Sequence, residues 1–213
     1  PDVAWRQALP QAAVWFDVPR TVDELVAASA ADGVVWIAVA NTAFANLARN
    51  WLGHVYKLRK ERIAAVVSLD EALVERLVRD EGAPCLDYAH SVERADLGGN
   101  LRSDVHHFQL YGVIKTELLL TLLLRGRDVL MSDVDVVWLA DPSATFASLS
   151  PADVMVSTDC LSPEFEAKRE EEPPPAYGPA RCAFLPGNSR GHAAFNTGVI
   201  FIRATPAGLA VAA

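Results

Sequence analysis

The amino-acid sequence predicts an α/β layered fold built around a parallel sheet. Two observations lead to this prediction: short, almost uninterrupted apolar runs recur along the chain, and segments with helical spacing separate them. Such apolar runs are typical of strands that are buried on both faces of a parallel sheet. With 213 residues, 51% of them hydrophobic, the chain is long enough to bury a sizeable core around that sheet.

In the first part of the chain, the expected elements alternate between helix and strand. A helix at 22–31 follows Thr21, carries Asp23 and Glu24 in its first turn, as helix N-termini favour, and ends at Gly33. The next expected elements are a buried strand at 34–40, a helix at 44–52, a second buried strand at 62–69, a helix at 71–80 and a short strand at 85–88.

In the second part, one long helix precedes three further strands. We expect the helix at 104–125, with Gly126 as its C-cap, and the strands at 128–131, 153–157 and 197–203. Residues 163–191 are rich in Pro, Glu and Gly, which predicts a long surface loop. No closing helix is recognisable after the last strand, so we interpret residues 1–213 as a single domain with a truncated C-terminal part.

The charge balance excludes several classes of partner. The chain has 19 Lys and Arg against 27 Asp and Glu, a net charge of −8, which argues against a nucleic-acid-binding face. Its longest uncharged apolar stretch, 34–48, is interrupted by Asn41, Thr42 and Asn46 and is too short for the roughly 20 apolar residues of a membrane span. We expect no span in this chain, although a membrane anchor in a longer parent protein stays open.

The cysteines give no metal motif. Cys85, Cys160 and Cys182 form no CxxC pair, which excludes a structural zinc knuckle and a thioredoxin-like motif. Two alternatives remain open for them: a bridge between Cys160 and Cys182 in an oxidising compartment, or buried free thiols.

The most informative local feature is a pair of carboxylates, Asp133 and Asp135, at the end of the apolar run 128–131. Alternation in an extended segment puts both side chains on one face. Two carboxylates so placed repel each other unless a cation lies between them, and a divalent ion completed by a ligand pyrophosphate is the natural candidate. Acidic pairs at strand ends also cap neighbouring helices or face water, so the pair alone does not establish a metal site.

A lysine on the preceding helix supports the idea of an anionic site. The spacing of Phe108, Tyr111, Lys115, Leu118 and Leu122 predicts one apolar stripe facing the sheet, with Lys115 on it. Lysine in such a position is either a structural, snorkelling residue or a cation that reaches ligand phosphates or the acidic pair.

Three motifs in this order resemble the nucleotide-diphospho-sugar transferase family of plants and algae, glycosyltransferase family 77. They are residues 126–142, which contain the acidic pair, residues 153–160, and residues 195–203, which begin Phe-Asn-Thr-Gly. The resemblance implies a GT-A-type, Rossmann-like fold with a mixed, mostly parallel sheet flanked by helices. It further implies a UDP-sugar donor, Mn²⁺, retention of anomeric configuration, the Golgi lumen, and a cell-wall glycan or glycoprotein acceptor.

The resemblance also implies roles for particular residues. Asp135 would bind Mn²⁺ directly, and Asp133 would bind the metal or the donor ribose. Asp159 and Asn196 match the donor-sugar positions, which makes them the candidate catalytic residues, and Gly198 would permit close approach of the backbone.

The ends of the first two strands offer candidates for nucleotide contact. Asn41 and Thr42 follow the first strand and Asp70 follows the second, at the edge where α/β sheets bind ligands. All three have an alternative interpretation as helix caps. A third metal ligand, often histidine in such folds, is expected beyond Ala213, because His192 lies at the end of the long loop.

Two competing functions fit part of the sequence. Asp133 and Asp135 also satisfy the DxDxV pattern of haloacid-dehalogenase-type phosphohydrolases, although that motif belongs near the start of its domain and here two strand-helix units precede it. A non-catalytic domain that keeps affinity for nucleotide sugars is the other alternative.

Overall fold

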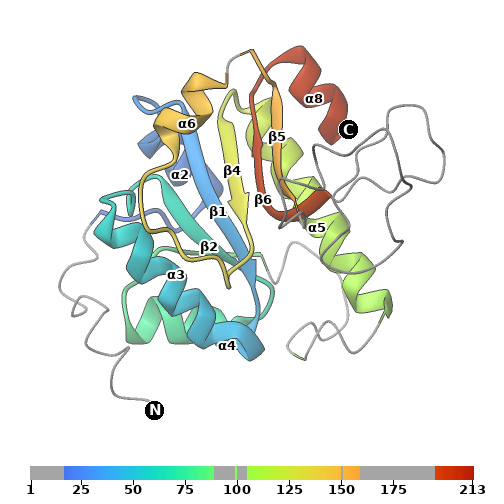
Figure 1. Cartoon of the computed structure of the whole chain (residues 1–213). Helices are drawn as coiled ribbons and strands as arrows, with labels where there is room; N and C mark the ends of the chain where they lie inside the picture. Colours follow the sequence, from blue (N-terminus) through green and yellow to red (C-terminus); the bar gives the residue numbers. More distant parts are fainter. Residues whose placement is uncertain (1–16, 89–98, 100–104, 150, 159–194) are drawn as a thin grey trace.

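A computed structural model describes residues 17–88, 99, 105–149, 151–158 and 195–213. These residues build one six-stranded mixed sheet with the strand order β3-β2-β1-β4-β6-β5 (Figure 1). Strands β1 to β4 run parallel, β6 is antiparallel to β4, and β5 is antiparallel to β6. The strands are β1 (Val34–Ala40), β2 (Ala64–Ser68), β3 (Cys85–Asp87), β4 (Asp128–Ser132), β5 (Val154–Thr158) and β6 (Phe195–Ile202).

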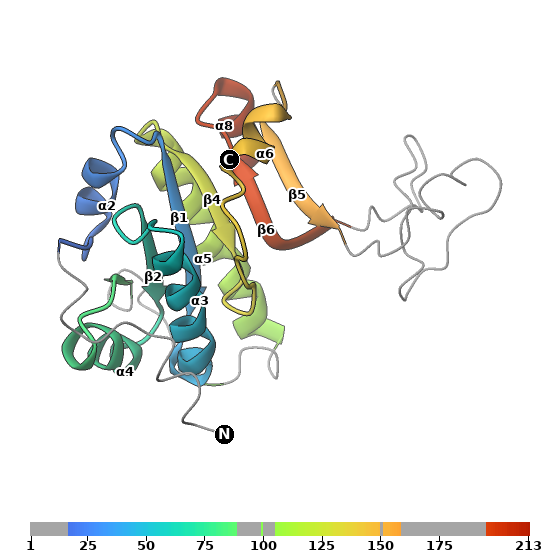
Figure 2. The ribbon, with the colours of Figure 1, turned by 60° about the vertical axis from the view of Figure 1, so that its left-hand side comes forward.

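Helices cover both faces of the sheet (Figures 1 and 2). The longest helices, α3 (Ala45–Lys57) and α5 (Val105–Leu124), pack on opposite faces. The remaining elements are α2 (Val22–Ala28), the 3₁₀ turn η2 (Thr42–Phe44), α4 (Glu71–Val74), the π-helical turn η3 (Glu75–Asp80), α6 (Ser143–Ser148) and α8 (Pro206–Ala212). No helix in the described residues is both long enough and apolar enough to cross a membrane.

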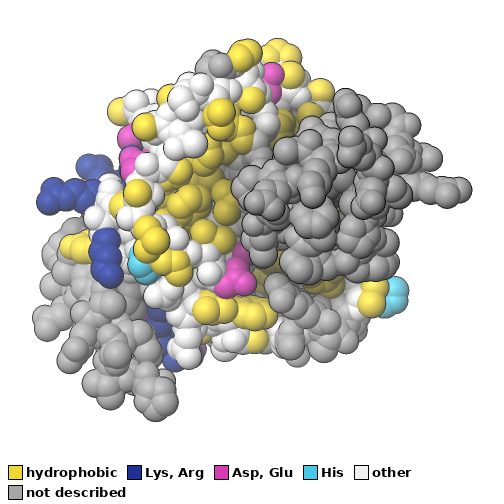
Figure 3. All heavy atoms as spheres, in the orientation of Figure 1, with side chains coloured by type: hydrophobic (Ala, Val, Ile, Leu, Met, Phe, Trp, Pro, Cys, Tyr) yellow, Lys and Arg dark blue, Asp and Glu magenta, His cyan; other side chains and the backbone are white. Residues whose placement is uncertain are grey.

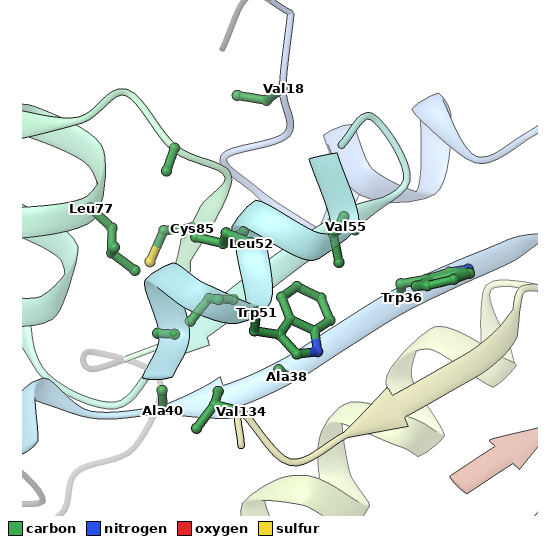
Figure 4. Packing of buried hydrophobic residues seen from close by; sticks show 14 of the residues in the cluster. Val18, Trp36, Ala38, Ala40, Trp51, Leu52, Val55, Leu77, Cys85 and Val134 are labelled. Carbon is green, nitrogen blue, oxygen red and sulfur yellow. The ribbon is translucent and has the colours of Figure 1, made fainter. Parts of the chain in front are cut away.

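The apolar run of β1 supplies both cores because successive side chains of a strand point to opposite faces. Val35, Ile37 and Val39 belong to the cluster on the α5 side, whereas Trp36 and Ala38 belong to the cluster on the α3 side. Figure 4 shows Trp51 of α3 pointing toward β1 near Ala38. Every residue of β1 after Val34 is buried, which explains why this strand contains no polar residue.

The strand order reverses between β1 and β4, which creates a topological switch point. The chain moves outward from β1 through β2 to β3, then returns so that β4 pairs with the other edge of β1. The paired residues end at Ala38 and Ser132, so β1 continues past the last residue of β4. In open α/β sheets, the crevice at the carboxyl ends of the strands beside such a switch point is where ligands bind.

Most expected elements are present, with several corrections. The capping box at Thr21 and Glu24 confirms the expected start of α2, and β1 has the predicted bounds. The helix expected at 44–52 runs to Lys57 after the turn η2, and the helix expected at 71–80 divides into α4 and η3. Helices α6 and α8 were not expected, and α8 corrects the prediction that no helix follows the last strand. The loop expected at 163–191 lies outside the described residues.

Candidate functional site

A cavity of about 430 Å³ lies at the switch point, between the beginnings of α3 and α5. Its volume falls in the range of roughly 300–1,000 Å³ that is common for small-molecule sites. One wall of the cavity is apolar. The acidic residues Asp133 and Asp135 follow the end of β4, and the basic residue Lys115 belongs to α5. The lining residues are Val39, Ala40, Asn41, Phe44, Leu47, Phe108, Tyr111, Gly112, Lys115, Asp133, Val134, Asp135 and Thr197.

Lys115 and Asp133 form the charged centre of this cavity. The Lys115 ammonium group donates to Asp133 Oδ1 at 2.9 Å and to the Thr197 carbonyl oxygen at 3.2 Å. The lysine is 7% exposed, and its stem packs among the buried residues of α5, as its place on the apolar stripe predicts. Its charge also lies 5.5 Å from the centre of the Tyr111 ring, whose hydroxyl donates to the Val39 carbonyl oxygen. The buried Lys115 is therefore held in place by Asp133 and by the backbone of β6.

The segment that carries the two carboxylates is a turn, which corrects the expectation of an extended segment. β4 ends at Ser132, and the Val136 N–H donates back to the Asp133 carbonyl oxygen at 3.2 Å. Val134 is buried in the core on the α3 side, where Figure 4 shows it next to Ala40, while Asp135 is exposed. Both carboxylates nevertheless line the cavity, because the turn rather than strand alternation brings them together.

Gly198 of β6 holds the backbone of Asp133, and Asn196 holds Gly198 in turn. The Asp133 N–H donates to the Gly198 carbonyl oxygen at 2.8 Å, and the Gly198 N–H donates to Asn196 Oδ1 at 2.5 Å. The Ser157 hydroxyl donates to the Asn196 carbonyl oxygen at 2.9 Å, at an irregularity in the pairing of β5 with β6. The Asn196 side-chain oxygen is thus held by the backbone of its own strand. Asp159, the other expected sugar-binding residue, lies outside the described residues.

The ends of β1 and β2 are tied together by Asp70. Its carboxylate accepts from the Thr42 N–H at 2.6 Å, from the Thr42 hydroxyl, and from the Leu73 N–H at 2.8 Å as the N-cap of α4. Asn41 is fully buried, donates from Nδ2 to the Gly99 carbonyl oxygen at 2.7 Å, and makes no side-chain cap of the turn η2. Of these residues, Asn41 lines the cavity, whereas Thr42 and Asp70 brace the turn behind it.

The apolar wall was not predicted as part of a site. Phe44 and Leu47 come from η2 and α3, and Phe108 and Tyr111 come from α5. The sequence placed Phe108 on the stripe facing the sheet, but it is 54% exposed, because the first turns of α5 reach past the ends of β4 and β6 (Figure 1). In the sequence, the hint that Phe44 could belong to the site is its position shortly after the first predicted strand.

The donor set of the acidic pair fits a hard divalent ion. Such ions prefer carboxylate oxygens, and Asp135 offers an exposed carboxylate beside Asp133, whose second oxygen makes no bond to Lys115. In the described part of the chain, no group of three or more His, Cys, Asp and Glu side chains gathers around one point. Within the described residues, the pair alone offers fewer oxygen ligands than such an ion binds.

Cys85 is a buried free thiol on β3. Burial raises the pKa of its thiol to about 12, against the opposing effect of the nearby Arg20 charge. For this cysteine the free-thiol alternative is confirmed, whereas Cys160 and Cys182 lie outside the described residues.

A nucleotide-binding α/β protein is the class that this sheet, its switch-point cavity and the paired Lys115 and Asp133 define. The sequence profile of the nucleotide-diphospho-sugar transferase family matches residues 62–212, and the chain belongs to that family. Family membership overturns the phosphohydrolase alternative.

Two individual proteins are similar to this chain. It is 30% identical over 161 residues to arabinosyltransferase XEG113 of Arabidopsis thaliana, a match that covers 70% of this chain but 24% of that protein. The chain thus spans about a quarter of the length of this relative. The crystal structure of galactosyltransferase LgtC in complex with donor and acceptor sugar analogs overlaps 80% of this chain and 58% of its own, with 17% identity and a TM-score of 0.41.

Proposed function

We propose that the chain forms the donor-binding part of a Mn²⁺-dependent glycosyltransferase that moves a sugar from a UDP-sugar to a glycan or glycoprotein acceptor. The observation that carries this proposal is the contact of the buried Lys115 with Asp133, beside the exposed Asp135 in the switch-point cavity. A cation and two carboxylates at one point suit a diphosphate that arrives together with a divalent ion. The Arabidopsis relative is an arabinosyltransferase, which favours an arabinosyl donor.

The residues of the cavity have different roles in donor binding. Asp135 would hold the ion, and Asp133 would share it or bind the donor ribose. Bound Mn²⁺ supplies Lewis-acid stabilisation of the charge that grows on the leaving nucleoside diphosphate. Lys115 adds a second positive charge at the same place and keeps Asp133 oriented through its 2.9 Å contact. The apolar wall of Phe44, Leu47 and Phe108 excludes water from the nucleoside end of the cavity.

Further features belong to the same proposal. Residues 1–213 form a single transferase domain, Asp159 and Asn196 contact the donor sugar, and Gly198 lets the backbone approach it. The family resemblance supports retention of anomeric configuration and a Golgi lumen location.

Titration calorimetry of the full-length protein with UDP, with and without Mn²⁺, tests the proposal. Mn²⁺-dependent UDP binding is expected, with GDP as the matched control nucleotide. A panel of UDP-sugars, including UDP-arabinose, UDP-xylose and UDP-galactose, then identifies the donor through Mn²⁺-dependent hydrolysis. UDP affinity that is independent of divalent ions would overturn the metal role, and binding without turnover of any sugar would identify a non-catalytic relative.

A further inference from the structure

The proposed function assigns no role to the last residues of the motif 126–142, which contains the acidic pair. Residues 136–142 follow the acidic pair, run across the α3 side of the sheet and lead into α6 (Figures 1 and 2). They contain no helix or strand. Figure 3 shows hydrophobic side chains gathered on this face between α3 and α6, with an acidic patch near the turn after β4. The exposed Val137 and Leu139 belong to this segment, and Trp138 lies between them.

Helix α3 holds the residues just before this segment. The Trp51 indole N–H donates to the Ser132 hydroxyl at 2.8 Å in a fully buried contact. Val134 then packs in the same apolar cluster as Trp51 and Ala38. The last residue of β4 and the residue between the two carboxylates are thus both fixed against α3 and β1.

One turn further along α3, His54 holds the middle of the segment. Its Nδ1 lies 3.1 Å from the Trp138 carbonyl oxygen. Because a carbonyl oxygen only accepts, Nδ1 carries the proton in this hydrogen bond. The Trp138 ring packs against Trp36 of β1, with ring centres 5.3 Å apart and the planes tilted by 57°.

A third contact holds the end of the segment. Lys60, just beyond α3, lies 2.9 Å from Asp141 Oδ2 and 5.9 Å from the centre of the Trp36 ring. Burial alone raises the pKa of the Asp141 carboxyl, but hydrogen bonds from Ser143 and Lys60 outweigh it and lower that pKa below the usual value. Asp141 therefore stays ionised and paired at neutral pH.

We infer that His54 is a positioning residue for Asp135 and acts through the Trp138 backbone. Asp135 itself is exposed, and it lies between the anchors at Val134 and Trp138. Fixing the backbone of a free residue costs about 1–2 kcal/mol, so a mobile Asp135 would lose part of its metal affinity to ordering. The hydrogen bond from His54 orders the segment when the protein folds, before any ion arrives. This inference rests on the proposed role of Asp135 in metal binding.

The test compares three variants of the full-length protein. His54→Ala removes the donor, and His54→Asn keeps an N–H donor close to the position of Nδ1. Lys57→Ala is the matched control, because Lys57 is exposed in the same last turn of α3. Amide hydrogen exchange over residues 133–141 is measured first, in metal-free protein. Calorimetry then gives the Mn²⁺ concentration for half-maximal UDP binding, and urea unfolding gives the global stability.

His54→Ala is expected to speed amide exchange across 134–139. It should also raise the half-maximal Mn²⁺ concentration about fivefold, because the free energy of ordering the backbone of one residue is then paid on ion binding. UDP affinity at saturating Mn²⁺ should stay as in the wild type, and His54→Asn should restore both quantities. Unchanged exchange in His54→Ala, or faster exchange with unchanged Mn²⁺ dependence, overturns the inference, as does failure of His54→Asn to restore it. A wild-type protein without Mn²⁺-dependent UDP binding would instead overturn the proposed function, and the exchange experiment would still show whether His54 orders the segment.

Discussion

The Lys115 ammonium nitrogen lies 2.9 Å from Asp133 Oδ1, so the protein's own cation occupies one oxygen of the proposed metal site. The two side chains come from different elements, α5 and the turn after β4, and the Lys115 side chain is 9% exposed against 31% for the Asp133 side chain. A divalent ion at the proposed site would therefore share the Asp133 carboxylate with Lys115. Such sharing would give the lysine opposite effects on the ion and on the diphosphate.

Lys115→Met should separate these two effects. Methionine keeps the apolar stem, while loss of the charge leaves Asp133 without the lysine cation that contacts it. Affinity for Mn²⁺ alone should rise and affinity for UDP at saturating Mn²⁺ should fall, each by about tenfold, the effect of roughly 1.4 kcal/mol. Calorimetry with Mn²⁺ alone and then with UDP measures both. If both affinities match those of the wild type, Lys115 is purely structural.

Asp135→Asn should abolish the Mn²⁺ dependence of UDP binding while the fold survives. Asn has nearly the same size, and Asp135 is exposed, so the change removes an anionic ligand without disturbing packing. Glu117→Gln is the matched control, because this exposed carboxylate on α5 lies outside the cavity. Mn²⁺-dependent UDP affinity, measured by calorimetry alongside a circular dichroism spectrum, checks the result. A folded Asp135→Asn protein with wild-type Mn²⁺ dependence would contradict the metal role.

The sequence predicts those parts of the fold that depend on long, simple patterns. The strand β1 has its expected bounds because every position after Val34 is buried and because Gly33 and Asn41 interrupt the apolar run. Helices α6 and α8 have 6 and 7 residues, too few for a helical period to stand out. The division of the helix after Asp70 into α4 and η3 depends on tertiary packing that no local pattern records.

The candidate site was predictable in its charges but not in its geometry. Spacing along α5 alone placed Lys115 in the core, and the structure confirms its burial. The Asp133 N–H bonds to the carbonyl oxygen of Gly198, which lies 65 positions away in the chain (198 − 133). The Val136 N–H then closes a turn on the Asp133 carbonyl oxygen, so strand alternation gave the wrong local shape. The contact of His54 with Trp138 likewise joins segments that only the folded sheet brings together.

Asp70→Ala should lower stability and leave UDP affinity unchanged. The Asp70 carboxylate caps α4 through Leu73 and holds the Thr42 backbone, and it does not line the cavity. Loss of the cap and of the Thr42 contacts should cost about 2 kcal/mol in the free energy of urea unfolding. Asp70→Ser keeps the cap and should recover about half of this loss. A drop in UDP affinity without a drop in stability would instead favour direct contact of Asp70 with the nucleoside.

Two glycine-to-alanine substitutions should have different consequences because different atoms surround the two sites. A Cβ at Gly198 would lie 2.6 Å from Asn196 Oδ1 and 3.5 Å from Asp133 Oδ2, both side-chain atoms of the candidate site. A Cβ at Gly208 would collide with the Arg203 carbonyl oxygen, which is backbone and cannot turn away.

Gly198→Ala should therefore act on donor binding more than on the fold. The new methyl group displaces the Asn196 side chain from the Gly198 N–H and toward the candidate site. Mn²⁺-dependent UDP-sugar affinity should therefore fall about tenfold. The broken hydrogen bond should cost about 1 kcal/mol in stability. Gly208→Ala should cost about 3 kcal/mol in stability, as overpacking against rigid atoms does, and leave the affinity of the folded fraction unchanged. Urea unfolding and calorimetry with UDP-sugar measure the two quantities for each variant. Equal losses of stability in the two variants, with donor affinity unchanged in both, would show that Asn196 and Gly198 serve the β5–β6 pairing alone and leave the candidate site independent of them.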